Sequence, residues 1–553
     1  MLEVSEDNFF RVRAYRNAAR TVRDCSTQVS EMTPSAIREL PGVGEDLARK
    51  LETLIKTGEL PLHRELSQRV SPGLVELLRL PGLGPKRVRM LRERLGVKDA
   101  ATLKAALESG AVGNLKGFSA KLEQRLLQGL SNLEAEPAKR LRFVDAELLV
   151  QQLFAHLRAS SAIMRLEMAG SFRRRKETVG DLDVIAVSRK SSAVADRLVS
   201  FPAVTDILAK GEAKTTVVLN RQVQVDLRVF APKSYGAALV YFTGSSSHCV
   251  HLRRIAQHHG LLLNEYGLFR DGKAVAGENE EGVYAALGMS WIPPELREDR
   301  GEVEAALAGK LPKLIELDDL RGDLHSHTTW TDGRATLEEM ARAARARGLE
   351  YLAITDHSRR LAMAHGLDSR RLREQWREIE QTEARVGKIR LLRGIEVDIL
   401  EDGSMDLPTA ILAELDWVVG SVHYKLDQRA DLMTKRIIKA IRNPHVDAIG
   451  HPSTRLINQR EPSSFDFAEI LRVAREEGCA LEINAQPDRL DLDDTACLAA
   501  KRAKVRLVIS SDAHHPLNFD LLQYGVNQAR RGWVEATDVL NTRPLKQFLS
   551  LRR

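Results

Sequence analysis

Seven short β-rich segments follow one another beyond residue 320, and helical stretches such as TLEEMARAARARG (336–348) lie between them. The segments are GDLHSH (322–327), YLAITDH (351–357), LLRGIEV (391–397), WVVGSVH (417–423), HVDAIGH (445–451), ALEINAQ (480–486) and RLVISSDAH (506–514). This alternation is typical of a parallel βα barrel. Because such barrels carry their chemistry at the carboxyl ends of their strands, we expect the functional groups there.

Six of the seven segments end in a potential metal ligand, and one further carboxylate follows the first segment. The candidates are His325, His327, Asp332, His357, Glu396, His423, His451, Asp512 and His514. Imidazole and carboxylate ligands suit zinc, manganese or iron(II), and the lack of thiolates argues against a purely structural zinc site. Nine ligands suit two or three neighbouring ions, which together favour phosphate-ester hydrolysis. His258, His259, His365, His445 and His515 fall outside the pattern, and we expect them at the surface or supporting the ligands.

A second constellation lies in GSFRRRKETVGDLDVIAV (170–187). Asp181 and Asp183 alternate on a predicted strand, so both carboxylates project from one face. Asp226, in VQVDLRVF (223–230), would complete a cluster of three carboxylates, which are ligands that Mg²⁺ prefers. Gly170 and Ser171 lie upstream, where small side chains let backbone N–H groups approach a triphosphate. The pattern therefore indicates nucleotidyl transfer with two metal ions.

The N-terminal region contains an internal repeat. LPGVGEDLARKL (40–51) recurs as LPGLGPKRVRML (80–91), and NLKGFSAKLEQRLL (114–127) is a weaker third copy. A glycine hairpin between two helices directs backbone N–H groups at a phosphate without needing base-specific side chains. The repeats therefore resemble helix-hairpin-helix motifs, and the predicted DNA-binding residues are Gly42, Gly44, Gly82, Gly84 and Lys86.

Composition limits where the chain can work. The four cysteines, Cys25, Cys249, Cys479 and Cys497, show no paired spacing, and no apolar stretch approaches the ~20 residues of a membrane span. We therefore expect a reduced cytoplasmic protein with no membrane contact; association with the nucleoid is expected only if the chain binds DNA. The net charge of +7 permits nucleic-acid binding but does not require it.

The motifs of both halves resemble known families. GSFRRRKETVGDLDV, YFTGS (241–245) and LLNEYGLF (262–269) look like bacterial family X DNA polymerases, which are similar to DNA polymerase beta. HSH, TDH, the Glu of GIE, SVH, GH and SDAH look like the motif series of the polymerase-and-histidinol-phosphatase (PHP) domain. The resemblances imply a multidomain chain: an all-α helix-hairpin-helix region, an α+β nucleotidyltransferase palm and thumb, and a C-terminal α/β distorted (βα)7 barrel.

The polymerase resemblance assigns roles in the middle of the chain. It implies that catalytic Mg²⁺ or Mn²⁺ is bound by Asp181, Asp183 and Asp226. The nucleotide phosphates would be bound by Gly170, Ser171, Arg174 and Gly180. The deoxyribose would lie against Tyr241, Phe242 and Gly244, and Arg253 would lie near the templating base pair. Two positions depart from the family pattern. Gln224 replaces a basic residue of animal relatives, and Cys249 stands where an Asn often touches the incoming base, so nucleotide selection is expected to differ.

The PHP resemblance implies two or three Mn²⁺ or Zn²⁺ ions in three ligand sets. These are His325, His327, Glu396 and Asp512; then Glu396, His423 and His451; and then Asp332, His357 and His514. Some polymerase PHP domains have lost ligands and become structural. All nine positions are filled here, so the resemblance implies an active phosphoesterase.

The first hairpin of family X lies in a domain that can carry a 5′-deoxyribose-phosphate lyase, and the nucleophile's position matches Lys50, with Tyr15 nearby. A lysine attacks a sugar aldehyde only if its pKa is depressed. Asp46 occupies a place that is basic in animal relatives, which argues against strong lyase activity. Lys50 is therefore either a nucleophile or a phosphate-contacting or solvated residue.

Family members usually place a helix before FRVRAYRNAAR (10–20), so either this helix is absent or the start of the chain is assigned late.

The predicted domains follow the motifs along the chain. They are a lyase-like helical DNA-binding domain (1–68), a fingers-like helical DNA-binding domain (69–134), a palm (135–235), a thumb for nucleotide selection (236–300), a linker (301–317) and a PHP phosphoesterase domain (318–553).

Together the resemblances imply a polymerase that fills gaps during DNA repair, including base excision repair, with a 3′→5′ exonuclease in the barrel. The expected partners are gapped or primed duplex DNA and dNTPs, and the chain is expected to be a monomer. One alternative is a repair nuclease (exonuclease or AP endonuclease) whose polymerase half mainly positions DNA; the three intact aspartates count against it. The other is a polymerase with a structural PHP barrel, which the nine intact ligands oppose.

Overall fold

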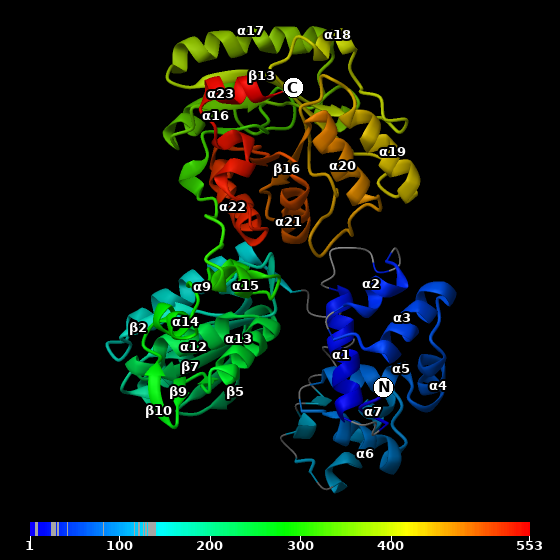
Figure 1. Ribbon diagram of the computed structural model, residues 1–553, viewed down its shortest axis with the longest axis vertical. Coiled ribbons are helices and arrows are strands. Elements are labelled where there is room, and N and C mark those ends of the chain that lie inside the picture. Colours follow the sequence, from blue (N-terminus) through cyan, green and yellow to red (C-terminus); the bar gives the residue numbers. More distant parts are fainter. Residues whose placement is uncertain are drawn as a thin grey trace. The chain divides into compact units, whose positions relative to one another are not determined.

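The chain divides into two compact units, Met1–Lys139 and Arg140–Arg553, each with its own hydrophobic core (Figure 1). The computed structural model describes residues 1–5, 9–23, 29, 32–40, 42–80, 82–115, 117–119, 122–124, 126, 127, 130 and 140–552. Cys25, the predicted palm boundary at residue 135, and residues 116, 120, 121 and 125 of the third hairpin copy lie outside these residues.

The first unit is helical in the part that the structure describes. Its α-helices are α1 (Phe9–Arg23), α2 (Pro34–Arg38), α3 (Glu45–Thr57), α4 (Pro61–Arg69), α5 (Pro72–Glu76), α6 (Pro85–Leu95) and α7 (Ala100–Glu108). Gly42 and Gly82 have φ values of +76° and +93°, which glycine adopts without steric cost. Gly44 and Gly84, two residues later, cap α3 and α6. The two predicted hairpins therefore have the same backbone form.

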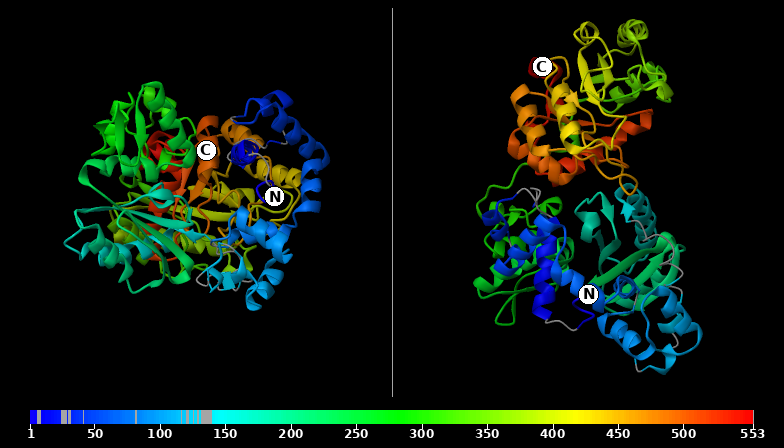
Figure 2. Two further views of the ribbon diagram at one scale, coloured as in Figure 1. Left: turned by 90° about the horizontal axis from the view of Figure 1, so that it is seen from below. Right: turned by 90° about the vertical axis from the view of Figure 1, so that its right-hand side faces the viewer.

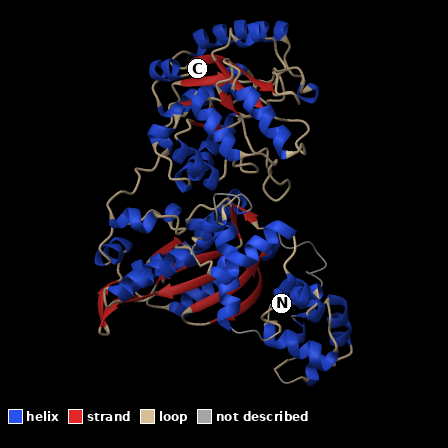
Figure 3. Cartoon of the chain, turned by 45° about the vertical axis from the view of Figure 1, so that its right-hand side comes forward, coloured by secondary structure: helices blue, strands red, loops and turns tan. Residues whose placement is uncertain are grey.

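The palm is a five-stranded sheet in the order β2-β4-β7-β6-β5. Its strands are β2 (Arg165–Met168), β4 (Asp181–Val187), β5 (Val204–Lys210), β6 (Lys214–Leu219) and β7 (Val223–Phe230). Helices α9 (Phe143–Arg158) and α11 (Ser191–Val199) share one apolar core with β4 and β7. Figure 3 distinguishes the strands, in red, from the helices, in blue. Helix α10 (Gly170–Arg173) and strand β3 (Thr178–Val179) precede β4.

The thumb surrounds a small antiparallel sheet, β10-β9-β8. Its elements are α12 (Tyr235–Thr243), α13 (Ser246–His258), β8 (Leu262–Asn264), β9 (Gly267–Arg270), β10 (Lys273–Ala276), α14 (Glu280–Ala286) and α15 (Glu302–Leu307). Helix α15 belongs to the segment that the sequence indicates as a linker. Val303, Ala306 and Leu314 of that segment are buried in the thumb core, so 301–317 packs against the thumb rather than running through solvent.

The C-terminal part is a barrel of seven parallel strands in sequence order, which confirms the predicted fold class. The strands are β11 (Gly322–Asp323), β12 (Tyr351–Ile354), β13 (Arg390–Asp398), β14 (Trp417–Ser421), β15 (Ala448–Ile449), β16 (Ala480–Asn484) and β17 (Leu507–Ser510). Each lies in or overlaps one of the seven predicted segments. A parallel bridge between Ser326 and Ala513 joins the first strand segment to the last and nearly closes the ring.

Helices surround the barrel strands, shown from green to red in Figure 2. The longer ones are α16 (Leu337–Ala346), α17 (Ser369–Val386), α19 (Ala430–Ile441), α20 (Phe467–Glu477), α21 (Asp494–Ala503) and α22 (Leu522–Arg531). Strand residues alternate between two cores: Leu352 and Ile354 pack with the helices, whereas Tyr351 and Ala353 belong to an inner cluster. Phe548 of α23 (Leu545–Leu551) stacks on Tyr351 and fills that cluster, so the barrel is a packed core.

Among the described residues, no helix combines the length and the apolar character needed to cross a membrane.

Candidate active sites

The predicted ligands of the barrel gather at one mouth because parallel strands end on the same side. His325 and His327 follow β11, His357 follows β12, and His423 follows β14. His451 follows β15, and Asp512 and His514 follow β17. Glu396 lies near the end of β13. All nine side chains are therefore brought together, and most are buried; Asp332 and His514 are the more exposed members.

Glu396 lies at the centre of the cluster. Its Oε1 is 3.0 Å from Nε2 of His451 and 3.2 Å from Nε2 of His423. Its Oε2 is 2.7 Å from Nδ1 of His357 and 3.5 Å from Nε2 of His325. A carboxylate whose two oxygens face different histidines can be shared by two ions, as the sequence resemblance implies.

The structure groups the ligand atoms into three compact sets, within each of which they lie within 4.8 Å of one another. They are His325, His327 and Asp512; His357, Glu396 and His423; and His327, Asp332, His357 and His514. The sets agree in most members with those that the resemblance implies. There are three differences: Glu396 is absent from the first set, His327 and His357 each belong to two sets, and His451 is in none of the sets but contacts Glu396 through Nε2.

Several buried imidazole nitrogens have no hydrogen-bond partner among the described residues. They are Nε2 of His325, both ring nitrogens of His327 and Nδ1 of His451. Leaving a buried polar atom unpaired costs about 1–3 kcal/mol, so such atoms call for a ligand. The donor set therefore fits divalent transition metals, which accept neutral imidazole nitrogen together with carboxylate oxygen.

Electrostatic coupling within the cluster is strong. Burial, together with the neighbouring His514 and His357, lowers the pKa of His327 to about 3, so this ring is neutral and ready to bind a cation. Burial opposes protonation of His423, but the Glu396 and Asp398 carboxylates outweigh it and raise its pKa to about 9. Cations entering the site would therefore displace protons from some ligands.

Two buried carboxylates support the ligands, and the motif series did not identify them. Nδ1 of His325 donates to Oε1 of Glu482 at 2.7 Å, and Nδ1 of His423 donates to Oδ1 of Asp398 at 3.0 Å. Such bonds fix the tautomer of a metal-binding histidine and orient its ring. Glu482 lies on β16, the one predicted strand that ends in no ligand. The sequence feature that indicates Glu482 is a single charged residue inside an otherwise apolar predicted strand.

A cavity of about 790 Å³ opens beside the ligands Asp332, Asp512 and His514. Its wall includes the cationic side chains of Arg334 and Arg489, which suit a phosphate group. His515, which the sequence pattern left aside, also lines this cavity.

The palm places the three predicted aspartates on one face of the sheet. Strands β4 and β7 are parallel, and Asp183 is the register partner of Asp226. Asp181 lies two residues before Asp183 and so points to the same side. Burial, with the charges of Asp181 and Asp226, raises the pKa of Asp183 to about 6, as expected where carboxylates crowd together. Among the described residues, these carboxylates are not part of the compact ligand sets, all of which lie in the barrel.

Asp226 already has a cationic neighbour. Nζ of Lys214, on the adjacent strand β6, is 2.7 Å from Oδ2 of Asp226, and Thr216 donates to its Oδ1 at 2.7 Å. Gln224, noted as a departure from the family pattern, donates to the same Oδ1 at 3.2 Å. Lys214 thus supplies positive charge beside the third aspartate from a different strand, and the sequence motif did not identify it.

The residues expected to bind the phosphates begin at a tight turn. Gly170 has φ +60°, and a Cβ built on it would lie 2.3 Å from Oδ2 of Asp183. Ser171 Oγ is buried and has no hydrogen-bond partner among the described residues. Arg174 is mostly buried and donates to Oε1 of Glu298 at 2.9 Å and to the Thr243 carbonyl at 2.7 Å. Gly180 lies against Arg140, whose guanidinium would be 2.8 Å from an added Cβ.

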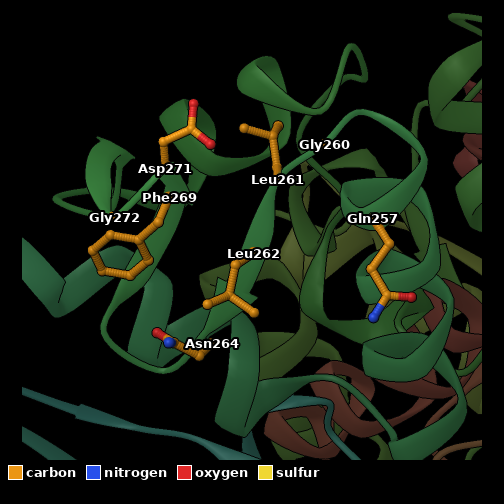
Figure 4. Close-up of a pocket in the computed structure, with 8 residues that line it drawn as sticks. All are labelled: Gln257, Gly260, Leu261, Leu262, Asn264, Phe269, Asp271 and Gly272. Carbon is orange, nitrogen blue, oxygen red and sulfur yellow. The ribbon is translucent and has the colours of Figure 1, made fainter.

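The thumb brings the remaining predicted residues together around α12 and α13. Arg253 lies 5.1 Å from the ring centre of Tyr241, which packs edge-on against Phe242 at 4.9 Å. Gly244 ends α12, where a Cβ would come within 2.7 Å of His248. A separate pocket of about 530 Å³, lined by Gln257, Leu262, Asn264 and Asp271, contains none of the predicted site residues (Figure 4).

The helical unit presents two helix N-termini and one paired lysine. Gly44 and Gly84 make no side-chain cap, so N–H groups of the first turns of α3 and α6 can face an anion. Lys86 lies exposed in the first turn of α6. Lys50 Nζ pairs with Oδ2 of Asp46 at 2.5 Å and lies 5.2 Å from the centre of the Tyr15 ring.

Comparison with protein families gives four matches along the chain. Residues 1–60 match a helix-hairpin-helix domain, and residues 74–132 match a SAM-like helix-hairpin-helix tandem. Residues 238–298 match the DNA polymerase beta thumb, and residues 323–486 match the PHP domain.

Individual relatives cover either the whole chain or its barrel. The DNA polymerase/3′-5′ exonuclease PolX of Bacillus subtilis (strain 168) is 38% identical over 549 residues, which are 99% of this chain and 95% of that protein. A probable phosphatase of Thermoanaerobacter sp. (strain X514) is 30% identical over 245 residues, 42% of this chain and 95% of that protein. A probable phosphatase of Vibrio cholerae serotype O1 (strain M66-2) is 27% identical over 258 residues, 41% of this chain and 98% of that protein. This chain therefore belongs to the PolX family, the bacterial family X DNA polymerases that carry a C-terminal PHP domain.

Proposed function

We propose that this protein is a DNA-directed DNA polymerase that fills short gaps during DNA repair and that its PHP barrel removes nucleotides as a 3′→5′ exonuclease. One observation carries the proposal. A single chain, similar to PolX over nearly its whole length, has a cluster of three aspartates on the palm and a cluster of histidines and carboxylates at the barrel mouth.

In the palm, Asp181, Asp183 and Asp226 would hold two Mg²⁺ or Mn²⁺ ions. Such ions supply polarisation of the primer 3′-hydroxyl and neutralise the pyrophosphate that leaves. Ser171 offers an unpaired hydroxyl, and Arg174 offers a guanidinium, to the β- and γ-phosphates. Tyr241 and Phe242 form the wall for the deoxyribose, with Gly244 at the end of the helix. Lys214 balances the charge of Asp226 while no cation is bound.

In the barrel, the nine ligands would hold two or three Mn²⁺ or Zn²⁺ ions. These ions supply an activated water and Lewis acidity toward a phosphodiester. Glu482 and Asp398 orient His325 and His423, and Arg334 and Arg489 bind phosphates of the strand that enters the cavity. The buried histidines keep bulk water away from the centre of the cluster.

The expected partners follow from these sites. The paired hairpins with Gly42, Gly44, Gly82, Gly84 and Lys86 would bind the backbone of gapped or primed duplex DNA, and dNTPs would enter the palm. The protein would act as a monomer, on DNA in the nucleoid of the cytoplasm.

Two single substitutions test this function against its alternatives. Asp183→Ala should abolish primer extension on gapped DNA and leave degradation of a labelled 3′ end intact. His325→Ala should do the reverse. Absence of extension by the unchanged protein would favour a nuclease whose polymerase half only positions DNA. Extension that survives Asp183→Ala would place synthesis outside the acidic cluster, and degradation that survives His325→Ala would favour a structural barrel.

A further inference from the structure

One face of helix α22, which belongs to the PHP barrel, contacts the palm. Tyr524, Asn527, Gln528 and Arg531 are spaced i, i+3, i+4 and i+7, so they lie along one side of the helix. Tyr524 donates to Glu147 of α9 at 2.7 Å. The other three contact a single short segment of the palm, residues 174–177. The barrel therefore holds this segment from outside the polymerase domains.

The contacts on residues 174–177 involve both backbone and side chains. Arg531 donates to the carbonyl oxygen of Arg174 at 2.7 Å. Asn527 accepts a hydrogen bond from Arg175, and Gln528 donates to Glu177 at 3.3 Å.

The held segment has an unusual backbone. Arg175 has φ +55°, a left-handed conformation that costs a non-glycine residue energy and persists only where surrounding contacts impose it. Its side chain reaches Asn527 of the barrel and lies 3.4 Å from Glu295 of the thumb. The N–H of Lys176 then donates to the carbonyl of Ser171 at 3.1 Å, which closes the turn onto the start of α10. The position of Ser171 is thus tied to residues that the barrel fixes.

Arg531 is coupled to Arg174 by a second route. Arg531 donates to Oε1 of Glu298 at 3.2 Å, and Arg174 donates to the same oxygen at 2.9 Å. Arg531 also pairs with Asp494 of the barrel, and only about 2% of its side chain is exposed. Burial opposes these charges, so the planar guanidinium fork is needed to satisfy all three acceptors at once.

We propose that Arg531 of the PHP barrel is a positioning residue of the polymerase site: it sets the turn that carries Ser171 and Arg174 toward the incoming triphosphate. This inference rests on the proposed role of Ser171 and Arg174 in phosphate binding. The PHP barrel would then support nucleotide binding in the palm in addition to carrying its own active site. Weakening the Arg531 contacts therefore raises the KM for dNTP and leaves exonuclease activity unchanged.

Arg531→Lys tests the proposal because it keeps the charge but has one terminal nitrogen, whereas Arg531 bonds the Arg174 carbonyl through Nη1 and Glu298 and Asp494 through Nη2. In the full-length protein we expect the KM for dNTP to rise about tenfold, the effect of losing one charged hydrogen bond, with a smaller change in kcat. Degradation of a 3′-labelled strand, measured on the same preparation, should stay at the wild-type rate. The matched control is Tyr524→Phe, which removes a hydrogen bond from the same helix face but leaves residues 174–177 untouched, so its KM should not change.

Three outcomes overturn or separate the claims. An unchanged KM in Arg531→Lys overturns the inference if Arg174→Ala raises the KM in the same assay. An unchanged KM in Arg174→Ala as well refutes the proposed phosphate role itself. If Arg531→Lys lowers both activities and the unfolding temperature, Asn527→Ala decides, since it removes the acceptor that holds Arg175 and keeps Arg531 in place. An unchanged KM in that variant overturns the inference.

Discussion

Nδ1 of His325 donates a hydrogen bond to the buried carboxylate of Glu482 at 2.7 Å, which directs Nε2 of the same ring toward Glu396 and Asp512, 3.5 and 3.6 Å away. Glu482→Gln removes the negative charge that makes this imidazole a strong ligand. We expect metal affinity and exonuclease activity to fall about 10- to 100-fold, with primer extension unchanged. A titration of the purified variant with Mn²⁺, followed by 3′-end degradation, measures the loss.

Glu476→Gln, on the exposed side of α20, is the control for adding an amide to the same barrel, and its metal affinity should match that of the wild type. Wild-type affinity in Glu482→Gln would mean that His325 needs no carboxylate to serve as a ligand.

Gly170 offers a test of the palm that does not remove a ligand. An alanine there adopts φ +60° at a cost of roughly 1–2 kcal/mol, and its Cβ would lie 2.3 Å from Oδ2 of Asp183. Gly170→Ala should therefore displace the carboxylate and reduce the kcat of primer extension at least tenfold, while 3′-end degradation continues. Gly260→Ala carries a similar backbone cost, because its φ is +67°, but its Cβ has no neighbour within 4 Å. Equal extension rates in the two variants would show that backbone strain alone accounts for the effect.

The sequence was sufficient to predict the barrel and the gathering of its candidate ligands at one end, because their pattern is local. Six of the seven predicted segments are short apolar runs that end in a candidate ligand, and the parallel topology brings those ends together whatever the helices between them do. The same holds for Asp183 and Asp226, whose strands pair in register. Strand periodicity therefore predicted the fold and the placement of the candidate carboxylates on neighbouring strands.

Residues that act through a neighbouring element could not be predicted in this way. Lys214 reaches Asp226 only because β6 and β7 pair in one register, which periodicity does not specify. Arg531 meets the carbonyl of Arg174 across 357 sequence positions, and no local motif marks either residue as the partner of the other. Contacts of this kind depend on how domains pack, so they became visible only in three dimensions.

Lys86 provides a test of the hairpins as phosphate-binding elements. It is exposed in the first turn of α6, beside the N–H groups that the hairpin directs outward. Lys86→Ala should weaken binding to duplex DNA without changing any preference among sequences, and it should reduce the slope of log K against log salt by about one. Lys104→Ala, an exposed lysine on α7, is the matched control. Fluorescence anisotropy over a salt series compares the slopes of the two variants. If the slopes are identical, Lys86 does not contact a DNA phosphate.

The pairing of Lys50 with Asp46 at 2.5 Å leads to a prediction about the lyase. Slight burial acts to lower the pKa of Lys50, but the hydrogen bond to Asp46 and the proximity of Tyr15 outweigh it, so the pKa is raised. A lysine must be neutral to attack an aldehyde, and a raised pKa reduces the neutral fraction at pH 7. Borohydride trapping of the chain on a 5′-deoxyribose-phosphate end should therefore be weak at pH 7 and should increase as the pH rises.

Asp46→Asn removes the charge that holds the proton and should increase trapping at pH 7, whereas Asp46→Asn combined with Lys50→Ala should trap nothing at this site. Efficient trapping by the unchanged chain at pH 7 would contradict this account, because the Asp46 pair would then not restrain the nucleophile.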